Sequence, residues 1–157
     1  MKEIMRNAME HGALGVSFSL IYVPGCYTKT DELIEIAKIV GEYHGVAAIH
    51  LRSEGNKLVS AAEEFIQIVR QSGVRGVISH HKAAGLSENW GKVHTTLRML
   101  DQANAEGLEL LVAFADYSIR FAFLTSEDIL NIFHIIKNWG HYSTFLLWNN
   151  CTTIMIF

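Results

Sequence analysis

The sequence predicts an α/β fold in which helices cover a parallel sheet. Short apolar runs alternate with amphipathic helical segments over most of the chain, and two histidines, His50 and His80, each end one of the apolar runs. The thirty positions between them are about the length of one βα unit. Alternation of this kind is typical of a parallel sheet with outer helices, and each crossover should be right-handed.

Periodicity and boundary residues define each element in turn. Residues 46–49 form an unbroken apolar run, the pattern of a strand that is covered on both faces. Thr30 is expected to cap a helix, and Pro24 marks the loop before it. The expected elements, in order, are a helix over 2–11, a strand over 13–20, a helix from 30 to near 45, a strand over 46–49, a helix over 56–71, a strand over 76–79, a helix after 91, a strand over 109–114 and a helix over 125–137. Residues 141–157 lack helical spacing, and their structure stays open.

Composition narrows the class of protein. A chain of 157 residues, half of them hydrophobic and 18% charged, suits one globular domain. The net charge of −3 gives no basic field, so we expect no nucleic-acid partner. Cys26 and Cys151 are too few for a disulfide framework, and the sequence has neither a signal peptide nor an apolar run long enough for a membrane span. We therefore expect a cytoplasmic protein.

His50 and His80 are candidate metal ligands. Both should lie at the carboxyl edge of the sheet, where α/β barrels place their active sites. Neutral imidazole is a common zinc ligand, and zinc can activate a bound water molecule as a nucleophile. Each histidine could instead simply pack, hydrogen-bonded, at the top of its strand. By strand alternation His81 should point away from the face of His80, so we expect it to be structural or to lie behind the ligands.

Four other kinds of side chain are candidates for supporting roles. Lys82 lies on the histidine-bearing face and could bind a substrate carboxylate, or it could be a solvated loop lysine. Arg52 and Glu54 could form a surface ion pair of little energetic value, or they could orient the metal ligands. Tyr22 and Tyr27 flank a turn on the same rim, where a phenol could donate to an anionic substrate.

Three stretches of the sequence carry a family pattern. They read GALGVSFSLIYVPGCYTKTDEL (12–33), IHLRSE (49–54) and ISHHKAAGLSENWG (78–91). In this order and spacing they resemble the N-acyl-D-amino-acid deacylases, or D-aminoacylases, of the amidohydrolase superfamily. The third stretch is the most specific, and the similarity covers roughly two thirds of the chain.

The resemblance implies a zinc-dependent (β/α)₈ barrel that hydrolyses the amide bond of N-acyl-D-amino acids through metal-activated water. His50 and His80 match the family's metal-ligand histidines on successive strands. Lys82 matches the lysine that meets the substrate carboxylate, and Tyr22 matches a tyrosine that lines the same pocket. Tyr117 corresponds to a substrate-contacting tyrosine of an Asp-x-Tyr-Pro-Tyr-like motif, of which only an Asp-Tyr pair remains here.

The sequence also departs from the family pattern. The family's His-x-His pair and bridging cysteine would precede the first residue, and its general-base aspartate would lie beyond the last. The resemblance ends near Val112. We therefore expect a central fragment of the enzyme, with about four strands of a barrel that needs about 250 residues. Residues 1–112 would form a partial barrel and residues 113–157 a divergent segment, for which native and non-native origins both stay open.

Three functional hypotheses remain open. The first is the zinc amidohydrolase fragment, which we expect to be inactive as an isolated chain. The second is a non-catalytic half-barrel that self-associates, or binds a partner, through its open strand edges. The third is another amide hydrolase of the superfamily, such as a cyclic-amide hydrolase, although Lys82 and the NWG sequence at 89–91 favour the D-aminoacylase branch.

Overall fold

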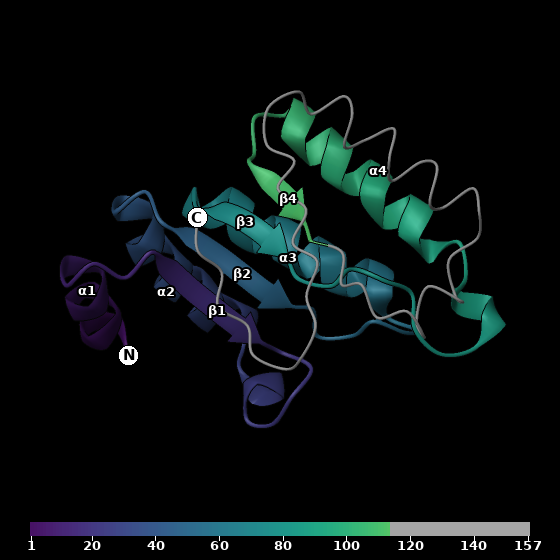
Figure 1. Cartoon of the computed structure of the whole chain (residues 1–157), viewed down its shortest axis with the longest axis horizontal. Helices are drawn as coiled ribbons and strands as arrows, with labels where there is room; N and C mark the ends of the chain where they lie inside the picture. Colours follow the sequence, from purple (N-terminus) through teal and green to yellow (C-terminus); the bar gives the residue numbers. More distant parts are fainter. Residues whose placement is uncertain (114–157) are drawn as a thin grey trace.

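The computed structural model describes residues 1–113, which form one parallel sheet and its helices (Figure 1). Helices and strands alternate along the chain, and two short 3₁₀ turns, η1 and η2, lie in the loops. In order, the elements are α1 (Lys2–Glu10), β1 (Gly15–Ser19), η1 (Gly25–Tyr27), α2 (Thr30–Glu42), β2 (Val46–His50), α3 (Leu58–Ser72), β3 (Arg75–Ile78), η2 (Ser87–Asn89), α4 (Lys92–Ala105) and β4 (Leu110–Val112). The α/β fold with four parallel strands is confirmed.

The strands are hydrogen-bonded in the order β1-β2-β3-β4, so neighbours in sequence are neighbours in the sheet. In Figure 1 the arrowheads point toward the same end of the sheet. The helices α1, α2, α3 and α4 contact one another in chain order and form the second layer. The sheet is open among the described residues, as in a segment of a (β/α) barrel.

The register of the strands separates two faces of the sheet. Phe18, Ile49 and Ile78 are paired in one row, and all three are buried in the core cluster shared with the helices. The adjacent row, which points to the opposite face, runs from the exposed Ser17 through Ala48 to Leu111, which is 42% exposed. His50 pairs with Ser19 and lies two residues after Ala48 in β2, so its side chain is on the same face as Ala48, opposite the helices.

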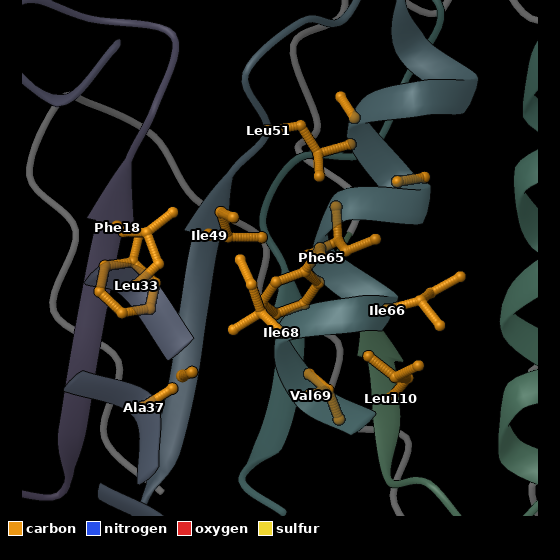
Figure 2. Close-up of a cluster of buried hydrophobic side chains, with 14 of the residues drawn as sticks. Phe18, Leu33, Ala37, Ile49, Leu51, Phe65, Ile66, Ile68, Val69 and Leu110 are labelled. Carbon is orange, nitrogen blue, oxygen red and sulfur yellow. The ribbon is translucent and has the colours of Figure 1, made fainter. Parts of the chain in front are cut away.

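Helix α3 packs closely on the centre of the sheet, and Gly76 in β3 permits this approach. A Cβ at Gly76 would lie 2.7 Å from Val69 Cγ2 and 3.0 Å from Phe65 Cε1, closer than these atoms can pack. Phe65 is fully buried, and Figure 2 shows it and Ile68 projecting from α3 into the core. The tight contact between α3 and β3 holds the strand ends, and therefore the loops that follow them, in a fixed arrangement.

Some sequence-based boundaries differ from the structure. The first and fourth strands are shorter than predicted, since β1 ends at Ser19 and β4 at Val112. Thr30 is the first residue of α2 rather than its cap, because its hydroxyl donates to Glu64 in α3 and Lys29 occupies the cap position. The helix predicted over 125–137, and the predicted division between residues 1–112 and 113–157, involve residues beyond those described. No helix within residues 1–113 has both the length and the apolar character needed to cross a membrane.

Candidate metal and substrate site

His50 and His80 meet at the carboxyl end of the sheet. His50 is the last residue of β2, and His80 follows the end of β3 by two residues. His50 Nδ1 and His80 Nε2 face each other in a short contact, and the ring centroids are 4.3 Å apart. One ring nitrogen of each histidine thus lies at the same place above the ends of β2 and β3.

Burial affects the charge of His50. Desolvation lowers its pKa, the neighbouring His80 and Lys82 lower it further, and Glu54 partly opposes the shift. The imidazole of His50 is therefore held neutral near pH 7, the form in which histidine binds metals.

The backbone at His80 directs two consecutive histidines to different places. The φ angle of His80 is 41°, in the left-handed region that most residues avoid. Its ring meets His50, whereas the ring of His81 is buried against α4, where Nε2 lies 2.8 Å from Thr96 Oγ1. The separation was predicted from strand alternation, but β3 has already ended at Ile78, and the left-handed turn is the actual cause.

His81 is a packing residue in this arrangement. It is 3% exposed, and burial lowers its pKa to about 4, so the ring is neutral. Its Nδ1 has no hydrogen-bond partner among the described residues. Because the ring is enclosed between the end of β3 and α4, it does not reach the point where the other two histidines meet.

Glu54 joins the histidine pair to Lys82. Its Oε1 lies 2.7 Å from His80 Nδ1, and its Oε2 accepts from Lys82 Nζ at 2.5 Å. Burial alone would raise the pKa of Glu54, but these two partners lower it to about 2, so the carboxylate is ionised. With Nδ1 of His80 donating to Glu54, Nε2 keeps its lone pair directed at His50.

Of the two alternatives for Arg52 and Glu54, the ion pair between them does not form. Arg52 binds Glu64 of α3 and the carbonyl oxygens of Cys26 and Thr28 in the loop after β1. The reason is geometric, because Glu54 is already engaged by His80 and Lys82 on the other side of the loop. Sequence reasoning missed Glu64, which carries no local signal beyond lying on a helix.

The three tyrosines singled out from the sequence have different outcomes. Tyr22 lies edge-on to His50, with ring centroids 6.1 Å apart and an interplanar angle of 65°. Its side chain is 61% exposed and therefore open to a ligand. Tyr27 is 77% exposed and sits in the same loop. Tyr117 lies outside the described residues.

Asn89 stabilises the loop after β3 through its side-chain hydrogen bonds. Asn89 is buried, donates from Nδ2 to the carbonyl of Ala84 at 2.9 Å and accepts from Lys92 Nζ at 2.5 Å. The backbone N–H of Ala84 in turn donates to the carbonyl of Glu54. Gly91 is the N-cap residue of α4, and no side-chain hydrogen bond caps the helix. The asparagine instead fixes the loop beside Glu54.

Comparison with known proteins finds similarity to N-acyl-D-amino-acid deacylases. No family model matches the chain. The chain is 37% identical over 105 residues to D-aminoacylase of Alcaligenes xylosoxydans xylosoxydans, a match to 67% of the chain and 22% of that protein. It is 31% identical over 140 residues to N-acyl-D-glutamate deacylase of the same organism, covering 89% of the chain and 28% of that protein.

Solved structures of similar fold are also N-acyl-D-amino-acid deacylases. The crystal structure of N-acyl-D-glutamate deacylase from Bordetella bronchiseptica, complexed with zinc and a phosphonate inhibitor, superposes with a TM-score of 0.72 at 33% identity. That match covers 74% of this chain and 24% of the deacylase. The chain is similar in sequence and fold to one segment of the N-acyl-D-amino-acid deacylases. A crystal structure of D-aminoacylase agrees, with a TM-score of 0.67 and 34% identity over 73% of this chain and 25% of that one.

The chain spans about a quarter of the length of these deacylases. Because the longer match takes in 140 of the 157 residues, it extends beyond Val112, where the resemblance was expected to end. The match to D-aminoacylase covers only 105 residues, so the two relatives differ in how far the similarity extends. The division of the chain into two segments stays a prediction.

Proposed function

We propose that this chain is a segment of a zinc-dependent amidohydrolase that cleaves the amide bond of N-acyl-D-amino acids. The observation that carries the proposal is the convergence of His50 Nδ1 and His80 Nε2 at the ends of neighbouring strands. The homologous deacylases supply the reaction class, and one of them was crystallised with zinc and a mimic of the tetrahedral intermediate.

The donor set fits zinc. Both candidate ligands are imidazole nitrogens, which zinc favours, and His50 is neutral. The ionised Glu54 beside His80 is the outer partner that metal-bound histidines usually have, and it stabilises the ring in one tautomer. Within residues 1–113 no group of three His, Cys, Asp or Glu side chains is arranged around one point, so the described part of the chain offers two ligands to the ion.

Each side chain has a distinct role in this proposal. Zinc, when bound, supplies the Lewis acid that polarises the scissile carbonyl and activates water. His50 and His80 hold the ion, and Glu54 orients His80. The ammonium of Lys82, fixed by the same carboxylate, binds the carboxylate of the substrate, and the exposed Tyr22 phenol lies where it can donate to the same group.

Zinc titration of the full chain by calorimetry tests the ligand assignment. We expect His50→Asn and His80→Asn each to weaken zinc binding by more than about tenfold, the smallest effect expected when even an outer partner of a ligand is lost. His11→Asn is the matched control, because His11 is exposed at the end of α1, where its Nδ1 lies 2.8 Å from the carbonyl oxygen of Asn7. Equal affinities in all four proteins would contradict the proposal.

The substrate class is tested separately on the zinc-loaded chain. An N-acetyl-D-amino acid should bind more tightly than its L enantiomer, and Lys82→Met should abolish the difference by removing the ammonium. Equal binding of the two enantiomers would refute the substrate assignment while leaving the metal assignment intact. The expectation that the isolated chain is inactive is checked in the same samples, since chelator-sensitive turnover would overturn it.

A second candidate function is self-association through a sheet edge. Among the described residues β1 pairs only with β2, so one edge of β1 offers unpaired backbone groups, and Leu14 beside it is 62% exposed. Light scattering over a range of concentrations should then show dimers or larger species. A charge in the edge strand, Ser17→Lys, should reduce them, and Ser60→Lys on the exposed face of α3 should not. A monomer at all concentrations would rule this candidate out.

A further inference from the structure

The loop that carries Tyr22 is held mainly by hydrogen bonds. This loop, residues 21–29 between β1 and α2, is called here the Tyr22 loop. Its apolar side chains are exposed, from 37% for Ile21 to 72% for Val23 and 77% for Tyr27. Because these side chains bury little apolar area, hydrophobic packing contributes little to the position of the loop.

Arg52 binds the backbone of the Tyr22 loop through hydrogen bonds. Its Nη1 donates to the carbonyl of Cys26 at 2.8 Å, and its Nη2 donates to the carbonyl of Thr28 at 2.9 Å. The N–H of Cys26 in turn donates to the carbonyl of Tyr22 at 2.8 Å. A continuous path of hydrogen bonds therefore runs from the guanidinium through Cys26 to Tyr22.

Glu64 fixes the guanidinium from the other side. Its two carboxylate oxygens accept from Nε and Nη2 of Arg52, both at 2.9 Å, in the two-pronged geometry that only arginine can form. The hydroxyl of Thr30, at the start of α2, donates to the same carboxylate at 2.8 Å. Glu64 itself lies on α3, which packs tightly on the sheet. The loop is thus fastened to a rigid helix.

The pair is well sheltered compared with the surface ion pairs. The side chains of Arg52 and Glu64 are 30% and 15% exposed, whereas those of Arg70 and Glu106 are 49% and 45% exposed. Burial would raise the pKa of Glu64, but the bonds from Arg52 and Thr30 lower it overall, so the carboxylate stays ionised and bonded.

We propose that Arg52 and Glu64 form a clamp that positions Tyr22 beside His50. Arg52 is a positioning residue in this assignment, acting through the loop backbone rather than on a metal or substrate. The functional meaning of the clamp rests on the function proposed above, in which Tyr22 meets the substrate carboxylate. A loop already held in place loses less conformational freedom when the substrate binds, so the clamp strengthens binding rather than the chemical step.

Amide hydrogen exchange of the full chain tests the clamp without turnover. In Arg52→Ala and in Glu64→Ala, the amides of Cys26, Tyr27 and Thr28 should exchange faster by about tenfold or more, because the bonds to the charged partner are lost. Arg70→Ala removes an arginine of α3 from an exposed ion pair and is the matched control. Amides of β2 and α3 should remain protected in every variant, which shows that the fold is intact.

A spectroscopic readout separates positioning from general destabilisation. Because the Tyr22 and His50 rings are 6.1 Å apart, the Tyr22 ring should shift the ring-proton resonances of His50, and Tyr22→Leu gives the value without it. In Arg52→Ala the His50 resonances should move toward the Tyr22→Leu value, and in Arg70→Ala they should not. Arg52→Lys should behave like Arg52→Ala, since lysine keeps the charge but cannot bond Glu64 and two carbonyls together.

Three results would overturn the clamp: unchanged loop exchange in folded Arg52→Ala, unchanged His50 resonances in that variant, or full restoration by lysine. If Arg52→Ala does not fold, Glu64→Gln provides the same test with an isosteric side chain. The zinc titration of His80→Asn is independent of these readouts. The experiments can therefore contradict the clamp without contradicting the proposed function, and they can contradict the proposed function without contradicting the clamp.

Discussion

The two faces of the sheet are stabilised by different interactions. On the helix-covered face, Phe18, Ile49 and Ile78 form a buried apolar row, and Phe65 packs against it from α3. At the carboxyl end of the opposite face, polar side chains meet through hydrogen bonds and ion pairs, with His80 and Glu54 as the central contact. Apolar packing on the covered face therefore stabilises the fold, whereas the loops at the strand ends hold the polar side chains of the candidate site.

The largest effect should come from breaking the covered face. Phe65→Ala removes a fully buried ring and should lower the free energy of unfolding by about 3–5 kcal/mol. Leu111→Ala, on the opposite face and 42% exposed, should lower it by less than about 1 kcal/mol. Urea unfolding followed by circular dichroism measures both, and equal losses would refute the assignment of the two faces.

The next effect tests the polar side of the comparison. Glu54→Gln should weaken zinc binding by about 10–100-fold, because His80 loses the carboxylate that orients it. Glu63→Gln, on the exposed surface of α3, is the control and should leave zinc affinity unchanged. Calorimetric titration measures both variants, and a loss of affinity in the control as well would point to a general charge effect.

A smaller effect concerns the pH dependence of the clamp. The folded-state pKa of Glu64 is below its ordinary value, so its pairing stabilises the fold above the unfolded-state pKa, about 4.3, and is lost as the pH falls through the folded-state pKa. Glu64→Gln should therefore reduce the free energy of unfolding by about 1–3 kcal/mol at pH 7. The difference from the wild type should shrink at pH values below about 4. Urea unfolding at several pH values checks this, and a difference that grows toward acid would contradict it.

The smallest effect should come from the exposed ion pair between α3 and α4. Arg70 and Glu106 are 2.7 Å apart, but both side chains are close to half exposed. Arg70→Ala should change the free energy of unfolding by less than about 1 kcal/mol, and added salt should reduce even that. A larger loss would mean that exposure is a poor guide to the value of an ion pair in this protein.

The order and type of the elements were predictable from the sequence because hydrophobic periodicity reports burial. The unbroken apolar run at 46–49 and the amphipathic spacing at 56–71 correspond to β2 and α3, and the parallel pairing followed from their alternation. Strand ends were less predictable. Apolar residues such as Leu14 and Leu20 flank β1 without belonging to it. Hydrophobic periodicity therefore does not indicate the residue at which strand pairing ends.

The candidate site was predictable only in part. The meeting of His50 and His80 follows from their equivalent positions on neighbouring strands. The partners of Arg52 and Glu54 do not, because each lies in a loop where side-chain direction depends on tertiary contacts rather than on a repeat. Glu64 was missed, and the bonds of Asn89 were not predicted, for the same reason: these bonds join segments that are distant in sequence or depend on the shape of a loop.

The left-handed backbone at His80 has a consequence for protein engineering. Residues other than glycine pay about 1–3 kcal/mol to adopt such a conformation, and asparagine is among those that tolerate it best. A library randomised at position 80 and selected only for folded protein should thus be enriched in Gly and Asn. Selection for zinc retention should instead return His, so the two selections would separate the conformational demand of this position from its chemical one.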